Sequence, residues 1–363
     1  MLWLLLGATL LLAFVNGAND NFKGVATLYG SGVFSYRTAR VLAAGSTAAG
    51  SLASLALASG LAKAFSAKGL VPDTMLTPAF MTAVAIAAGL TVLAATRFGL
   101  PISTTHALVG GLAGAGFIAA GQSLNLAALG TVFALPLLVS PLVAIPLAFA
   151  GYSAGRWGRR RLGIEAESCV CIGEEWVPIH IASASLAAGN LTFSAGMTSQ
   201  CEKRYVGGIL GVSAQTVATA AHVASGSLVG FARGLNDTPK ILGLVVGASV
   251  MTPWLGTLAI TAVMVLGGVI ASRRVAETLA TKVTTMNPGQ GLAGNLSTSL
   301  LVTGASWFGL PVSTTHVSTG SIFGIGAAGA DLRWKMVAAI LAAWVTTLPM
   351  AAILGATAMW VLR

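Results

Sequence analysis

Seven long apolar stretches divide this chain, and their length limits the solvents in which it can fold. Most approach or exceed the roughly 20 residues that a helix needs to span a bilayer. They are Met1–Val15, Val41–Leu61, Ala79–Ala95, Leu124–Ala150, Ile209–Phe231, Pro253–Ala271 and Met336–Leu362. Charged residues make up only 8% of the 363 residues, against about 25% in a soluble domain. So few charges cannot cover a surface that faces water, and the pattern predicts a membrane protein.

Small residues are unusually frequent, with 45 glycines and runs such as Ala43–Gly50 and Gly110–Gly116. Such runs let transmembrane helices approach closely. They also permit backbone to leave helical geometry where it lines a cavity.

The net charge of +10 comes largely from basic residues between the apolar stretches. Those near the middle of the chain are Arg156, Arg159, Arg160, Arg161, Lys203 and Arg204. Basic loops between spans normally stay in the cytoplasm, so we expect a cytoplasmic linker there and no nucleic-acid partner. The start, Met1-Leu2-Trp3, has no basic n-region, and we expect a retained first span.

The three cysteines, Cys169, Cys171 and Cys201, all lie in this linker, with His180 nearby. Their spacing matches no standard zinc pattern. We therefore expect no metal and no cofactor, and interpret the cysteines as reduced thiols in a cytoplasmic loop.

Two polar motifs each occur twice, in the same order. Phe98-Gly-Leu-Pro-Ile-Ser-Thr-Thr-His106 recurs as Phe308-Gly-Leu-Pro-Val-Ser-Thr-Thr-His316, with one difference in nine residues. An Asn-Asp-x-x-Lys motif precedes each copy, at Asn19–Lys23 and Asn236–Lys240. Matches this long indicate a duplicated chain.

The predicted fold is an all-α polytopic membrane protein with about 10–12 spans, built from two homologous repeats with broken or re-entrant helices. Residues 1–155 form the N-terminal transmembrane repeat, residues 156–205 the cytoplasmic linker and residues 206–363 the C-terminal transmembrane repeat. In secondary transporters such repeats pack about a pseudo-two-fold axis, with the substrate site between them. An inverted relation requires an odd number of spans in each repeat, which the sequence leaves open.

Pro101 and Pro311 each precede a Ser-Thr-Thr triplet, and proline favours the start of a helix. Helix N-termini offer free N–H donors and partial positive charge, to which clustered hydroxyls add neutral donors. Because converging donors suit a tetrahedral anion, we predict that both helix starts face one cavity. The candidate substrate-binding residues are Ser103, Thr104, Thr105, Ser313, Thr314 and Thr315. The alternative is that these hydroxyls merely link neighbouring helices.

Asn19-Asp20 and Asn236-Asp237 each place a carboxylate beside an amide oxygen, and both are hard ligands for a cation. Ionisable residues at membrane depth are costly and usually face a water-filled path or a partner. We predict cation sites here, and the alternative is that each Asp caps a helix at the membrane boundary.

Histidines end both Ser-Thr-Thr segments. His106 and His316 can relay protons or orient a neighbouring threonine, and we favour orientation. His180 and His222 have no counterpart in the other half, and we interpret them as structural.

These motifs resemble those of the PiT inorganic phosphate transporter family. That family carries, in each half, a signature close to Gly-Ala-Asn-Asp-Val-Ala-Asn-Ala and a Pro-[Ile/Val]-Ser-Thr-Thr-His segment. Gly17–Asp20 and Gly234–Asp237 match the start of the first, and Pro101–His106 and Pro311–His316 match the second. The resemblance implies an all-helical, inverted-repeat carrier with both termini outside and cation-coupled phosphate uptake. It also implies cation sites at the two Asn-Asp pairs and an anion site at the two Ser-Thr-Thr triplets.

Lys23 and Lys240 are where this chain departs from the family, which has asparagine at both positions. An ammonium group cannot ligate sodium, but it can take the position of that ion beside Asp20 or Asp237. We therefore hypothesise a proton-coupled or facilitative carrier. The alternatives are that the ammonium groups bind the anion directly or that both lysines extend to the membrane interface.

The predicted function is secondary transport of inorganic phosphate by a multi-pass protein of the cell membrane. A sulfate or other oxyanion permease of the same fold is one alternative, and an anion channel is another. An enzyme is not expected, because Ser and His lie three residues apart with no nucleophile elbow. The expected partners are the anion and the lipid bilayer, the coupling ion is proton or sodium, and a homodimer remains an open alternative to a monomer.

Overall fold

Two units make up the chain in the computed structural model, which describes residues 1–181, 184–204, 210–282, 286–329 and 334–363. Unit 1 comprises Met1–Tyr152 and Val223–Arg363, and unit 2 comprises Ser153–His222. Unit 1 thus contains both copies of each duplicated motif. It is described first.

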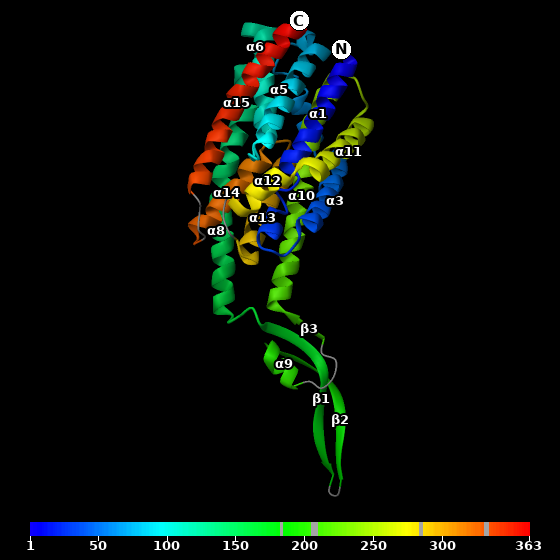
Figure 1. Cartoon of the computed structure of the whole chain (residues 1–363), viewed down its shortest axis with the longest axis vertical. Coiled ribbons are helices and arrows are strands. Elements are labelled where there is room, and N and C mark those ends of the chain that lie inside the picture. Colours follow the sequence, from blue (N-terminus) through cyan, green and yellow to red (C-terminus); the bar gives the residue numbers. More distant parts are fainter. Residues whose placement is uncertain (182–183, 205–209, 283–285, 330–333) are drawn as a thin grey trace. The chain divides into compact units, whose positions relative to one another are not determined.

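Unit 1 is helical, and its long helices run alongside one another (Figure 1). The α-helices of its first part are α1 (Leu2–Asp20), α2 (Ala26–Gly30), α3 (Tyr36–Leu57), α4 (Ser59–Phe65), α5 (Pro78–Arg97), α6 (Thr104–Ala120), α7 (Leu126–Ala128) and α8 (Leu135–Arg161), which belongs to unit 1 as far as Tyr152. Those of its second part are α10 (Ala214–Gly247), which belongs to unit 1 from Val223 onward, α11 (Pro253–Ala271), α12 (Arg273–Glu277), α13 (Pro288–Trp307), α14 (Thr314–Ala327) and α15 (Trp334–Leu362). Short 3₁₀ or π segments are η1 (Asp73–Met75), η2 (Gly121–Ser123), η3 (Leu129–Ala134) and η4 (Thr278–Lys282).

Six helical segments among the described residues are long and apolar enough to cross a membrane. They are Leu2–Asp20, Tyr36–Leu57, Pro78–Arg97, Leu126–Arg161, Pro253–Ala271 and Val337–Leu362. This confirms the expected helical, polytopic class. The figure of about 10–12 spans and the inverted relation between the halves stay predictions.

Matching turns end α5 and α13 just before the Ser-Thr-Thr segments. Gly99 and Gly309 adopt left-handed backbone, with φ of 68° and 67°. The following amides, of Leu100 and Leu310, donate to Ala95 and Ala305 at 2.9 and 2.8 Å. This glycine-centred C-cap, followed by proline, is a standard way to stop a helix. The Phe-Gly-Leu-Pro sequence therefore explains why both helices end there.

Glycines let several pairs of helices touch backbone to backbone. A Cβ atom at Gly17 of α1 would overlap the Met264 carbonyl of α11. One at Gly50 of α3 would overlap the Phe231 carbonyl of α10, and one at Gly114 of α6 would overlap the Ala352 carbonyl of α15. The expected role of small residues in close helix packing is confirmed.

Unit 2 contains a three-stranded antiparallel sheet in the order β2-β1-β3. Its strands are β1 (Ser168–Ile181), β2 (Ala184–Met197) and β3 (Leu210–Ser213), and the short helix α9 (Thr198–Arg204) follows β2. The sequence predicted a linker here and no sheet, although apolar residues such as Val170 and Ile172 alternate with the cysteines at the start of β1.

Cys201 of α9 lies against Cys169 and Cys171 of β1. Cys171 and Cys201 form a disulfide, and the Cys169 Sγ atom is 2.8 Å from that of Cys171 and 3.0 Å from that of Cys201. The prediction of three reduced thiols is therefore wrong for this structure. The 30-residue separation in sequence gave no sign that the turn after β2 returns Cys201 to β1.

Candidate functional site

Both Ser-Thr-Thr segments begin helices, as their prolines predict. α6 starts at Thr104 and α14 at Thr314. The Ser103 hydroxyl oxygen accepts from the His106 amide at 3.0 Å, and Ser313 accepts from the His316 amide at 3.2 Å. The two serines are thus N-caps, and the amides of the first turn lack partners within the helix.

The two segments meet inside unit 1. The Thr315 hydroxyl donates to the carbonyl of Ile102 at 2.7 Å, and the Thr105 hydroxyl donates to the carbonyl of Val312 at 3.3 Å. These are equivalent contacts, each made by one copy of the motif to the other. The halves therefore join at the triplets, whereas a cavity between them stays a prediction.

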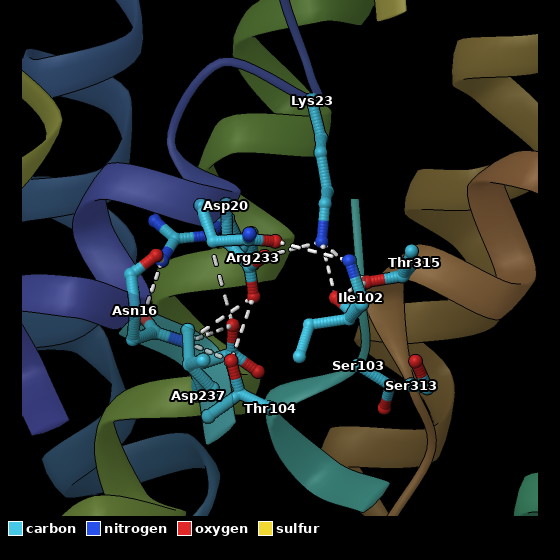
Figure 2. A network of polar contacts seen from close by, with 12 residues as sticks. Asn16, Asp20, Lys23, Ile102, Ser103, Thr104, Arg233, Asp237, Ser313 and Thr315 are labelled. Atoms are coloured by element: carbon cyan, nitrogen blue, oxygen red, sulfur yellow. Dashed lines mark hydrogen bonds and ion pairs between the residues drawn. The ribbon is translucent and has the colours of Figure 1, made fainter. Parts of the chain in front are cut away.

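Lys23, the lysine of the first Asn-Asp-x-x-Lys motif, contacts residues of both halves. Its ammonium group forms an ion pair with Asp20 and donates to the Thr315 hydroxyl. It also donates to the Ile102 carbonyl at 3.0 Å. Figure 2 shows the side chain reaching into this network. All three ammonium protons thus have an oxygen acceptor.

Lys240 makes the corresponding contacts from the second motif. Its Nζ atom lies 2.7 Å from the Thr105 hydroxyl and 2.6 Å from the Val312 carbonyl. The Asp237 carboxylate is 3.6 Å away. Each lysine therefore contacts the threonine of the other half and the carbonyl of its own half.

Asn16 and Arg233 join the two carboxylates, and neither was singled out from the sequence. The Asn16 amide nitrogen lies 3.2 Å from Asp20, 3.3 Å from Asp237 and 2.9 Å from the Thr104 hydroxyl. Arg233 donates to the side-chain oxygen of Asn16, and its Nε atom is 3.6 Å from Asp237 (Figure 2).

Aligning the two motifs would have found this pair. Asn16 stands four residues before Asp20, and Arg233 stands four residues before Asp237. A neutral amide in one half thus corresponds to a guanidinium in the other. Arg233 also donates to Asn21, and it lies 3.3 Å from the Thr47 hydroxyl.

Asn19 and Asn236 hold the chain that leads into each Ser-Thr-Thr helix. Asn19 donates to Leu100 at 3.0 Å and accepts from the Ile102 amide at 3.2 Å. Asn236 donates to Val312 at 3.2 Å and accepts from Ser306 at 3.2 Å. Both side chains therefore position backbone in this structure, and a role in cation binding stays a prediction.

The charged groups of this network are removed from the surface of unit 1. Among the side chains that the structure describes, the only buried Asp, Glu, Lys or Arg residues are Asp20, Lys23, Arg233, Asp237 and Lys240. Burial of unpaired charge is very costly. Three cations face two carboxylates, which leaves one positive charge in excess.

Most predicted substrate-binding hydroxyls already have partners. Thr104 donates to Asp20 at 3.2 Å, Thr105 and Thr315 contact the opposite half, and the serines cap their helices. Thr314 is buried at the start of α14. The structure thus brings together the six hydroxyl residues that the sequence predicted as a group. Their hydrogen bonds stabilise the starts of α6 and α14.

His106 and His316 contact each other, with ring centroids 4.2 Å apart and an edge-to-face geometry. His316 also packs against Trp344, at 3.8 Å between centroids. His222 is buried in α10, and the side chain of His180 lies outside the described residues. The two histidines that follow the triplets in sequence thus lie next to each other.

A bundle with apolar spans and a buried, duplicated ion network has the architecture of a membrane transporter. The model of the phosphate transporter family matches residues 16–355. The chain belongs to this family, which confirms the resemblance seen in the motifs, and it is a transporter and not an enzyme.

Two curated relatives match over nearly the whole chain. The "Probable low-affinity inorganic phosphate transporter" of Bacillus subtilis is 26% identical over 364 residues, covering 96% of this chain and 93% of the relative. A protein of the same name from Mycobacterium tuberculosis strain H37Rv is 27% identical over 358 residues, covering 94% and 73%.

A solved structure has the same fold. It is titled "The sodium-dependent phosphate transporter" and matches with a TM-score of 0.76 at 21% sequence identity. The match covers 99% of this chain and 98% of that one.

Proposed function

We propose that this chain carries inorganic phosphate across the cell membrane, and that Lys23 and Lys240 stand where a coupling cation would otherwise bind. Membership of the phosphate transporter family supports the substrate. The observation that carries the second part is the environment of Lys23. Its ammonium group contacts a carboxylate, a backbone carbonyl and a hydroxyl.

Such an oxygen set is what a hard cation takes from proteins. Lys240 has an equivalent set in Thr105, the Val312 carbonyl and the more distant Asp237. A fixed positive charge in each position stabilises the nearby carboxylate without a bound ion. Sodium would have to displace the ammonium group to bind, so we expect transport to be independent of sodium.

The two rival interpretations of the lysines are less well supported. Direct binding of the anion needs free ammonium protons, yet the three donors of Lys23 already have acceptors. Extension to the membrane interface needs an exposed side chain, whereas Lys23 is 6% exposed and Lys240 is 1% exposed.

The anion is expected to bind at the starts of α6 and α14. The first-turn amides there supply donors that the helix itself does not use. The excess positive charge of the network suits a singly charged anion such as dihydrogen phosphate. Binding would require Thr105 and Thr315 to exchange their carbonyl partners for the anion, which would loosen the contact between the halves.

The test is uptake of radiolabelled phosphate into proteoliposomes with sodium or choline as the only external cation. We expect equal rates with both cations, and competition by arsenate but not by sulfate. Adding a proton ionophore separates the proton-coupled form of the proposal from the facilitative form. Strict dependence of wild-type uptake on sodium would contradict the role of the lysines.

The double variant Lys23→Asn/Lys240→Asn restores the family's amide at both positions. We expect it to acquire sodium-stimulated uptake, because an amide oxygen can ligate sodium and an ammonium group cannot. Lys68→Asn, at an exposed position, is the matched control and should behave like the wild type. A double variant that folds and transports at the same rate in sodium and choline would count against the proposal.

A further inference from the structure

Among the side chains of the sheet and of α9 that the structure describes, the buried cluster is made of sulfur-bearing residues. Cys169, Cys171 and Cys201 form one buried cluster and are 7%, 1% and 3% exposed. The larger apolar residues nearby face outward, including Val170 at 43%, Phe193 at 67% and Val212 at 54% exposed. Within the described part of unit 2, no cluster of buried Leu, Ile, Val or Phe side chains accompanies the sulfurs.

Small residues surround the two cysteines of the central strand. Cys169 pairs with Gly196 of β2 and Ser213 of β3, and Cys171 pairs with Ser194 and Gly211. A Cβ atom added at Gly211 would lie 3.5 Å from the Cys171 Sγ atom. Both neighbouring strands thus leave room on the face where the sulfurs converge.

Cys201 completes the cluster from α9, of which it is the only buried residue. The start of the helix is attached to the residue before β1, because the Thr198 amide donates to the Glu167 carbonyl at 3.0 Å. The Met197 amide donates to the Gln200 side chain at 3.1 Å. These contacts fix the turn that returns Cys201 to the strand.

A fold with so small a core needs a covalent or metal-based link. The Cys171–Cys201 disulfide supplies one, but it leaves the third buried sulfur unexplained. Basic loops are retained in the cytoplasm, and thiols there are kept reduced. If unit 2 lies in the cytoplasm, as its basic residues predict, the cluster must be held together in another way.

We infer that Cys169, Cys171 and Cys201, when reduced, form a binding site for one thiophilic d¹⁰ metal ion, Zn²⁺ or Cu⁺. The three Sγ atoms already converge on one point, since Cys169 lies 2.8 Å from Cys171 and 3.0 Å from Cys201. Once the disulfide is reduced, the side chains need to move apart only slightly to reach the roughly 4 Å between thiolates that share one zinc ion. Thiolates are the ligands that these soft ions prefer. The described residues add no fourth His, Asp or Glu to the group, which suits trigonal Cu⁺ or leaves a place for water on Zn²⁺.

Formation of the site balances in two steps. A cytosolic dithiol delivers two electrons and two protons to the Cys171–Cys201 bond and becomes a disulfide itself. In vitro a phosphine delivers the two electrons, water supplies the two protons, and the oxygen of that water ends in the phosphine oxide. The ion then replaces the thiol protons, which are released to solvent. Lys203 and Arg204 at the end of α9 offset part of the negative charge that the thiolates bring.

The test uses the full-length chain in detergent with a phosphine reductant. We expect one equivalent of Zn²⁺ or Cu⁺ per chain after gel filtration, and Cd²⁺, a spectroscopic substitute for Zn²⁺, should give thiolate-to-metal charge-transfer absorption that saturates at one equivalent. Each of Cys169→Ser, Cys171→Ser and Cys201→Ser should weaken binding by more than about 100-fold, since even loss of an outer partner costs 10–100-fold. Val170→Ala, between the cysteines but on the opposite face, is the control.

Cys169→Ser is the decisive variant, because it keeps the pair that forms the disulfide. Without reductant, its unit 2 should resist proteolysis like that of the wild type, which shows that the variant folds. With reductant and metal, only the wild type should regain that resistance. Failure of the reduced wild type to bind either ion, or wild-type metal affinity in Cys169→Ser, would overturn the inference.

Discussion

The Asn-Asp-x-x-Lys motif ends a helix in one half of the molecule and lies within a helix in the other. α1 stops at Asp20, and a turn carries Lys23 back to that carboxylate. α10 continues past Asp237 to Gly247, although Pro239 lies inside it. Lys240 consequently stands 3.6 Å from Asp237. The two lysines thus contact equivalent oxygen atoms, although Lys23 lies in a turn and Lys240 lies within a helix.

The two halves also differ in how their carboxylates are paired with cations. Asp20 is paired mainly with Lys23, whereas Asp237 is shared between Lys240 and Arg233. Asn16, at the position of Arg233, bridges the carboxylates without adding charge. The duplicated residues make the contact between the halves symmetric. The difference between Asn16 and Arg233 makes the charge distribution at that contact asymmetric.

The largest expected effect comes from removing one carboxylate at a time. Asp237→Asn leaves two buried cations without their carboxylate, and Asp20→Asn leaves one. Breaking a buried pair in this way costs about 3–5 kcal/mol, so we expect both variants to be destabilised and Asp237→Asn more so. Unfolding in detergent, followed by circular dichroism, measures this, and exposed Asp73→Asn is the control. Equal losses in the two variants would mean that the halves are electrostatically equivalent.

A smaller effect is expected from making the second half resemble the first. Arg233→Asn removes the excess positive charge, so the KM for phosphate should rise about tenfold, equivalent to about 1.4 kcal/mol. Arg233→Lys should retain part of the affinity, because it keeps the charge but loses the forked contacts. Concentration-dependent uptake measures both, with exposed Arg37→Asn as the control. An unchanged KM in folded Arg233→Asn would show that the asymmetry has no role in anion binding.

The smallest effect is expected at the helix caps, where the halves match most closely. Ser103→Ala and Ser313→Ala each remove an N-cap and should each cost about 1 kcal/mol. Ser103→Thr and Ser313→Thr keep the cap and should unfold near the wild-type midpoint. Chemical unfolding of the four variants measures this. A marked difference between the two alanine variants would break the symmetry inferred for the triplets.

Much of the candidate site follows from local sequence. Pro101 and Pro311 predict the helix starts, and repetition of the motifs predicts that the halves contribute equivalent groups. The contacts of Thr105 and Thr315 could not be predicted, because each reaches a carbonyl in the opposite half. The contacts of Arg233 with Asn16 and Asn21 could not be predicted either, because these partners lie more than 200 residues away. Only its position four residues before Asp237 could have indicated it.

The sequence by itself determined the membrane class, the duplication and the ends of the motif helices. These follow from apolar length, repetition and the fixed backbone preferences of proline and glycine, which act over a few residues. Tertiary structure alone decided which oxygen atoms surround each lysine, how the carboxylates share their cations and where Cys201 lies. These depend on groups distant in the chain, and burial makes their pairing obligatory because an unpaired charge or donor is too costly away from water.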